Sequence, residues 1–176
     1  NVMSALGSYP GYADGVGPLG LECAGRVSAV GAGVTQLQPG DAVLAIAPGT
    51  FASHLTCPAE RVLPMLRDHS FAQAVAVPVA FLTAYYALAK LAQLVPGERV
   101  LIHSASGAVG LAAIQWAQHV GATVYATAGT PEKRAFLQSL GVAYVSDSRS
   151  DQFADDIRRW TSGEGVDVVL NSLSGE

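Results

Sequence analysis

The chain has 176 residues, which is enough for one full domain or two partial ones. Half of its residues are hydrophobic and only 14% are charged, a composition that suits an α/β protein whose sheet is covered on both faces. The net charge of −4 gives no electrostatic reason to expect nucleic acid or an anionic membrane as a partner, and no run approaches the roughly 18 apolar residues of a membrane span.

The first part of the chain is rich in glycine and in short β-type runs. Strands are predicted over Leu19–Val30, Ala42–Ala47 and Arg61–Met65, separated by glycine and proline turns. This pattern is typical of a small, irregular β-barrel or sandwich. Cys23 and Cys57 are too few for a disulfide framework and lack metal-ligand spacing, so we expect reduced core thiols in a cytoplasmic protein.

From Ser70 onward the pattern becomes helical. Ser70 is expected to cap a helix that runs through Ala76 and ends by Pro78, and a long apolar helix is predicted over Phe81–Leu94. Strands and helices then alternate, which predicts a doubly wound parallel sheet and places the domain boundary near residue 80. The strands are expected at Val100–His103, Thr123–Ala128, Val142–Val145 and Val166–Leu170, and the helices at Val109–Val120, from Pro131 to before Gly141, and at Asp151–Thr161.

The first of these strands runs into a glycine loop, Ser104-Ala105-Ser106-Gly107-Ala108-Val109-Gly110. A dinucleotide pyrophosphate needs backbone N–H groups at a helix N-terminus with no side chain in the way. Gly107 lies where the backbone must approach the phosphates, and Gly110 lies where the helix must pack closely on the strand. Ala105 replaces the first glycine of G-x-G-x-x-G, but the flanking strand and apolar helix supply the context that the motif requires. We predict a dinucleotide site; a tight strand–helix turn without a ligand is the alternative.

The residues after the second strand indicate which dinucleotide is bound. NAD sites place an Asp or Glu roughly 20 residues beyond the loop, where it binds the ribose 2′-OH. This chain has Gly129 at that position, with Glu132, Lys133 and Arg134 one turn further on. Two cations attract a 2′-phosphate, and an acid at the strand end would repel it. We therefore predict NADPH; the alternative is that Lys133 and Arg134 form a solvated helix face.

Three further segments carry a family resemblance: ALGSYPG near the start, FLTAYYAL in the middle and VDVVLNSLSGE at the end. Together with the glycine loop, they resemble the enoyl reductase domains of modular polyketide synthases and animal-type fatty acid synthases, in the zinc-independent medium-chain dehydrogenase/reductase superfamily. The resemblance covers essentially the whole chain. It implies a partial GroES-like β domain for substrate and catalysis (1–80) and a partial Rossmann domain that binds NADPH (81–176).

The resemblance also implies a reaction: reduction of an α,β-unsaturated thioester by NADPH. The substrate would be carried on the phosphopantetheine of an acyl carrier protein, among neighbouring synthase domains. Tyr9 matches the family tyrosine that lies beside the nicotinamide and is proposed as a proton donor. Thr83 matches a threonine that faces the nicotinamide end, and Ser148 with Arg149 matches a Ser-Arg pair near the adenosine phosphate.

Other positions are interpreted from their place in the pattern. Asn171 and Ser172 end a parallel strand at its carboxyl edge, where ligands bind in such sheets. Leu21 stands where zinc-dependent relatives have a histidine, so no catalytic zinc is expected. His103 is expected either to meet the coenzyme or to brace the loop; His54, His69 and His119 share no ligand spacing.

Two rival functions and one question of completeness stay open at this point. A free-standing NADPH-dependent quinone or alkenal reductase is one alternative, and a catalytically silent NADPH-binding scaffold domain is the other. The lysine and aspartate that the family offers as further proton donors would lie beyond Glu176. We expect the chain to be cut at both ends, because a sheet of so few strands leaves an unpaired edge.

Overall fold

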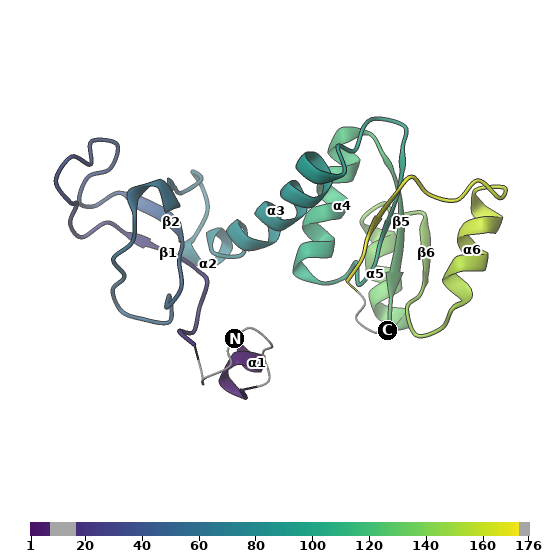
Figure 1. Ribbon diagram of the computed structural model, residues 1–176, viewed down its shortest axis with the longest axis horizontal. Helices are drawn as coiled ribbons and strands as arrows, with labels where there is room; N and C mark the ends of the chain where they lie inside the picture. The colour runs from purple at the N-terminus through teal and green to yellow at the C-terminus, as the bar shows by residue number, and fades with distance from the viewer. Residues whose placement is uncertain (8–16, 173–176) are drawn as a thin grey trace. The chain divides into compact units, whose positions relative to one another are not determined.

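Two sheets organise the chain, one in each of two units, Asn1–Val79 and Ala80–Glu176. The structure is a computed structural model that describes residues 1–7 and 17–172. The first unit has an antiparallel sheet and the second a parallel one, as the chain-order colouring of Figure 1 lets the reader follow. This confirms the predicted combination of a small β unit with a parallel α/β sheet.

The first unit contains a small sheet with the strand order β1-β2-β3. The chain enters through the short helix α1 (Val2–Ala5), and the 3-10 turn η1 (Ala59–Arg61) precedes the last strand. β1 is shorter than predicted because β2 offers it partners only from Glu22 to Arg26, and Gly20 before it has a left-handed φ of 89°. The strands are β1 (Glu22–Arg26), β2 (Ala42–Ile46) and β3 (Val62–Pro64).

The two cysteines of this unit are free and half-buried, so the expectation of core thiols is wrong in that respect. Cys23 lies on β1, an edge strand whose residues are only partly covered. Burial, and to a lesser degree the neighbouring Cys57, raise the pKa of the Cys23 thiol.

Ser70 begins a short helix, α2 (Phe71–Ala74), through a reciprocal capping box. Its hydroxyl accepts from the Gln73 N–H (3.3 Å), and the Ser70 N–H donates to Gln73 Oε1 (2.9 Å). Pro78 starts the next helix, α3 (Pro78–Tyr85), because proline suits the first turn, where its missing N–H is not needed. The helix therefore begins before the predicted Phe81, and it continues as the π-helical segment η2 (Tyr86–Leu91).

Replacing Ser70 with alanine should lower the free energy of unfolding by about 1 kcal/mol, because the Gln73 N–H loses the hydroxyl that accepts its hydrogen bond. Urea denaturation followed by circular dichroism measures this loss. Ser28→Ala is a matched control, since Ser28 is exposed and lies beyond β1, and it should change stability by less than about 0.5 kcal/mol. Equal losses in both variants would contradict the capping role.

By length and composition alone, the stretch Phe71–Leu91 could cross a membrane, with a mean hydropathy of 1.6 over 18 residues. The expectation that no run approaches this length is therefore corrected. The finding is weak, because core helices pass the same test and this stretch is interrupted at Val75–Val77. Ala80, Ala84 and Leu88 recur at helical spacing and pack into the core of the second unit.

The second unit is built on a parallel sheet with the order β6-β5-β4-β7. Ile102 pairs with Ala126 on one side and Leu170 on the other, which aligns the carboxyl ends of three strands. β6 lies later than the predicted Val142–Val145 because Val142, 2% exposed, packs into the core ahead of the strand. The strands are β4 (Arg99–Ile102), β5 (Thr123–Ala128), β6 (Tyr144–Asp147) and β7 (Val168–Leu170).

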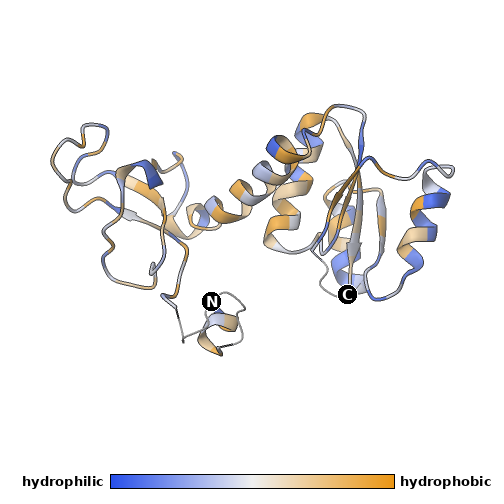
Figure 2. Cartoon of the chain, viewed as in Figure 1, coloured by the Kyte–Doolittle hydropathy of each residue, from blue (hydrophilic) through white to orange (hydrophobic). Residues whose placement is uncertain are grey.

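Helices cover both faces of this sheet, and Figure 1 shows α4 (Ala108–Val120) and α6 (Gln152–Trp160) on opposite sides. α5 (Pro131–Ser139) contributes Leu137 to the larger core on the α4 side. Alternate residues of β4 divide between the two cores, with Val100 and Ile102 in the larger and Leu101 in the smaller. In Figure 2, α6 carries hydrophilic residues beside hydrophobic ones, as a helix covering a sheet from solvent must.

Candidate functional site

The chain leaves β4 and turns tightly into α4. Ser104 has a positive φ of 50°, and the Gly107 N–H donates to the Ser104 carbonyl (2.9 Å), which closes the turn. Gly107 is the N-cap of α4 and makes no side-chain cap. Since the first N–H groups of a helix have no intrahelical acceptor, those of Ala108, Val109 and Gly110 are available at the carboxyl edge of the sheet. At the N-terminus of α5, by contrast, one of these N–H groups has a side-chain acceptor, because the Lys133 N–H donates to the hydroxyl of the N-cap residue Thr130 (3.3 Å).

Gly110 allows α4 to pack directly on the loop. A Cβ at this position would lie 2.6 Å from both the Cα and the carbonyl oxygen of Ala105, closer than real side chains approach. Ala105 is fully buried, and its N–H donates to the Thr127 carbonyl of β5 (3.0 Å). Gly107 is less constrained, with its nearest contact, the Ser104 carbonyl, 3.3 Å from a Cβ. The predicted close approach of helix and strand is therefore present at Gly110.

Gly129, directly after β5, lies beside the residues that follow β6. A Cβ on Gly129 would lie 3.0 Å from Arg149 Nε and 3.4 Å from Ser148 Oγ. The Arg149 N–H donates to Asp147 Oδ1 (2.8 Å), which turns the chain at the end of the strand. The structure thus brings Ser148 and Arg149 to the glycine that follows the second strand.

The two cations of α5 differ in their surroundings. Arg134 pairs with Asp147 (Nη1 to Oδ2, 3.1 Å) and donates to the Ala128 carbonyl (3.1 Å). Lys133 is exposed and makes no ion pair with any residue that the structure describes. Hydrogen bonds from its own backbone N–H, and then from Thr130, lower the pKa of Glu132, so this exposed carboxylate is ionised beside them.

The carboxyl edge gathers most of the predicted ligand residues. The loop 104–110 follows β4, Gly129 follows β5, Ser148 follows β6, and Asn171 and Ser172 follow β7. Thr83 is exposed on α3. Tyr9 lies outside the described residues.

His103 is buried beneath the loop rather than exposed to solvent. Its Nδ1 lies 3.1 Å from Thr127 Oγ1, and its ring meets Phe153 of α6 edge-on, with centroids 5.0 Å apart. Burial lowers the pKa of His103. Of the two expectations for this residue, the contacts favour bracing of the loop, and sequence spacing could not indicate these partners because they come from another strand and a distant helix.

Within residues 1–7 and 17–172, no three His, Cys, Asp or Glu side chains gather as a metal site would require.

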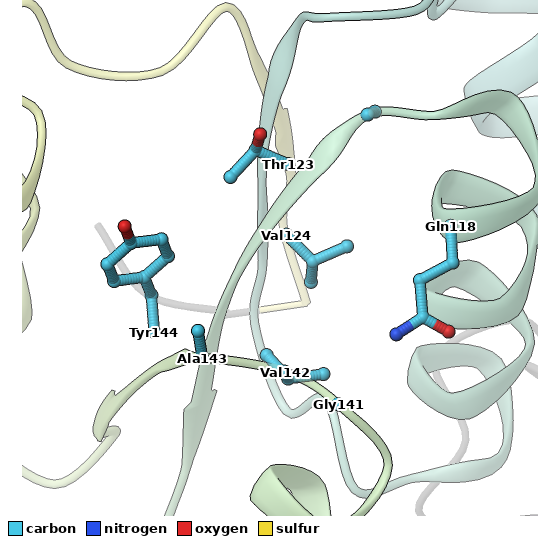
Figure 3. Close-up of a pocket in the computed structure, with 8 residues that line it drawn as sticks. Gln118, Thr123, Val124, Gly141, Val142, Ala143 and Tyr144 are labelled. Carbon is cyan, nitrogen blue, oxygen red and sulfur yellow. The ribbon is translucent and has the colours of Figure 1, made fainter.

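A pocket of about 180 Å³ lies between the end of α4 and the starts of β5 and β6 (Figure 3). This is the edge opposite the strand ends where nucleotides bind, so the pocket is separate from the candidate site. It is lined by Gln118, Ala122, Thr123, Val124, Gly141, Val142, Ala143 and Tyr144.

Each half of the chain matches a known protein family. The alcohol dehydrogenase GroES-like domain family matches residues 7–87, and the zinc-binding dehydrogenase family matches residues 108–176. The crystal structure of CurK enoyl reductase is 45% identical and superposes with a TM-score of 0.93, covering 99% of this chain and 55% of its own. The two family matches together place the chain in the medium-chain dehydrogenase/reductase superfamily.

The proteins similar to this chain include large synthases. One component of the phenolphthiocerol/phthiocerol polyketide synthase of Mycobacterium tuberculosis is 50% identical over 100% of this chain and 8% of its own length. The pikromycin polyketide synthase component PikAII of Streptomyces venezuelae is 46% identical over 100% of this chain and 5% of its own. The chain therefore spans under a tenth of these curated relatives, and the predicted resemblance is confirmed.

A solved fragment of the same family is similar to the second unit in particular. The nucleotide-binding subdomain of the enoylreductase domain of PpsC from Mycobacterium tuberculosis is 59% identical, with a TM-score of 0.54, over 55% of this chain and 54% of its own. The zinc in the second matching family's name has no counterpart at Leu21. The neighbouring Glu22 instead accepts from the Val79 N–H (2.8 Å) at the start of α3.

Proposed function

We propose that the chain is part of a polyketide synthase enoyl reductase, which uses NADPH to reduce an α,β-unsaturated thioester held on an acyl carrier protein. The observation that carries the proposal is the open N-terminus of α4, packed through Gly110 onto Ala105 in a chain of this family. Its partners would be the carrier protein and neighbouring synthase domains, in the cytoplasm.

The residues present suit a dinucleotide. The loop from Ser104 to Gly110 would hold the pyrophosphate through free N–H groups, assisted by the positive end of the helix dipole. Gly129 and Ser148 would border the adenosine, while Thr83, Asn171 and Ser172 would serve the nicotinamide end. A side chain at Gly129 would crowd Arg149 and Ser148, so the missing Cβ leaves room for these two side chains at the edge.

The charges at the end of β5 favour a 2′-phosphate over a 2′-hydroxyl. No acid occupies the position after β5, and Asp147 at the end of β6 is neutralised by Arg134. Lys133 and Arg149 are then the cations with capacity for a phosphate. A guanidinium and an ammonium donate strong charge-assisted hydrogen bonds to phosphate oxygens, whereas a hydroxyl gains little from them.

When bound, the coenzyme would supply the hydride for the β-carbon of the substrate. The chain's own contribution to the chemistry would be the proton for the α-carbon. Tyr9 is our candidate donor, because a phenol with a pKa near 10 is protonated at rest and can donate to an enolate.

The complete reductase domain that contains this chain should oxidise NADPH in the presence of crotonyl-pantetheine, as followed by absorbance of the reduced coenzyme. Tyr9→Phe should lower kcat by about 10²-fold or more if Tyr9 alone delivers the proton. Turnover with a quinone and none with the thioester would favour the free-standing reductase. Tight NADPH binding without any turnover would favour the silent scaffold.

A further inference from the structure

A row of buried polar side chains crosses the second unit beneath the proposed coenzyme site, on the face that α6 covers. It contains four of the five buried polar residues found in the described part of the chain: His103, Thr127, Ser146 and Asp156. Thr127 and Ser146 are paired in the register of β5 and β6. Ser146 Oγ donates to Asp156 Oδ2 (2.5 Å), and Arg159 pairs with the other carboxylate oxygen (2.6 Å).

At the loop end of this row, Thr127 holds the chain at two points. Its hydroxyl lies 3.1 Å from His103 Nδ1, and its carbonyl accepts from the Ala105 N–H (3.0 Å). Ala105 is the residue on which Gly110 packs. A shift of the His103 ring would therefore pass through Thr127 and Ala105 to the first turn of α4, whose N–H groups would bind the phosphates under the proposed function.

We propose that His103, in its uncharged form, is a positioning residue that holds the glycine loop in shape for the dinucleotide, and that protonation of its ring weakens coenzyme binding. The inference rests on the proposed function of the loop. His103 is 7% exposed and its ring lies edge-on to Phe153, a setting that solvates an imidazolium poorly.

Among residues 1–7 and 17–172, the surroundings of the ring offer no compensating charge. The described titratable groups on the same face are the phenols of Tyr125 and Tyr144 and the carboxylate of Asp156, which is already paired with Arg159 and Ser146. At the opposite end of β4, Arg99 is paired with Glu164. Burial, and none of these groups, lowers the pKa of His103. The ring is therefore uncharged at neutral pH and gains its proton only as the pH falls through this lowered value, so the loss of binding belongs to acid pH.

The test is a titration of NADP⁺ binding by calorimetry from about pH 8 to about pH 5, with the complete reductase domain. Wild-type affinity should fall by roughly five- to tenfold across this range beyond any change seen in His103→Gln, whose side chain hydrogen-bonds but does not titrate. His103→Gln should bind about threefold more weakly at pH 8, since one hydrogen bond is altered. The 2′-phosphate titrates equally in both proteins, so the difference between them isolates residue 103.

His119→Gln is the matched control, because His119 is exposed at the far end of α4. It should keep the wild-type acid loss, and circular dichroism should show all three proteins folded at the lowest pH. Parallel profiles for wild type and His103→Gln would overturn the inference and leave the coenzyme site intact. Failure of NADP⁺ to bind at any pH would overturn the proposed function itself, and this inference with it.

Discussion

Gly110→Ala should reduce NADPH affinity by more than about 100-fold, because a small displacement of a binding loop misplaces every group that it presents. The added Cβ would meet the backbone of Ala105 at 2.6 Å, and a backbone cannot rotate away as a side chain can. Helix propensity acts in the opposite direction, since alanine favours a helix by about 1 kcal/mol over glycine. A loss of affinity must therefore come from the steric contact. Fluorescence titration of NADPH measures the effect.

Gly25→Ala is the matched control for this substitution. Gly25 lies on β1, and nothing stands within 4 Å of the position that its Cβ would occupy. Its variant should bind NADPH as the wild type does. Gly107→Ala should fall between the two, because the 3.3 Å contact with the Ser104 carbonyl can relax by a few tenths of an ångström. Wild-type affinity in a folded Gly110→Ala protein would exclude the loop as the pyrophosphate site.

Features with a local cause were predictable from the sequence. The glycine loop, the cap at Ser70 and the alternation of strands and helices each depend on residues a few positions apart, and all are present. Where a local signal supported two structures, prediction was less successful. Proline at position 78 can end one helix or begin the next, and the structure uses it to begin α3.

Contacts between distant segments were beyond sequence reasoning. The partners of His103 come from β5 and α6, and their approach depends on sheet register and helix docking. The shortened β1 has the same kind of cause, because its length is set by what β2 can pair. Likewise, Lys133 and Arg134 are neighbours in the sequence, which suggests the same role for both. In the structure, Asp147 at the end of β6 pairs with Arg134 and not with Lys133.

Lys133→Ala should weaken NADPH binding by about 10- to 100-fold, the effect of losing a charge-assisted hydrogen bond to phosphate. NADH binding should change by less than about threefold, since a 2′-hydroxyl gains little from an ammonium group. Parallel titrations with the two coenzymes measure the selectivity. Arg158→Ala is the control, because Arg158 is an exposed cation on α6 whose partner is Asp155. This substitution should leave the affinities for NADPH and NADH unchanged.

Arg149→Ala separates two ways in which the end of β5 can recognise NADPH. Arg149 Nε would lie 3.0 Å from a Cβ on Gly129, so its guanidinium already stands at the strand end. If both cations hold the 2′-phosphate, Lys133→Ala and Arg149→Ala should each weaken the binding of NADPH more than that of NADH. Added salt should reduce the difference in NADPH affinity between each variant and the wild type, because salt screens exposed charges. Equal weakening of NADPH and NADH by Lys133→Ala would show that this lysine does not contact the 2′-phosphate. The same result for Arg149→Ala would mean that the guanidinium supports the adenosine side of the site and does not select between coenzymes.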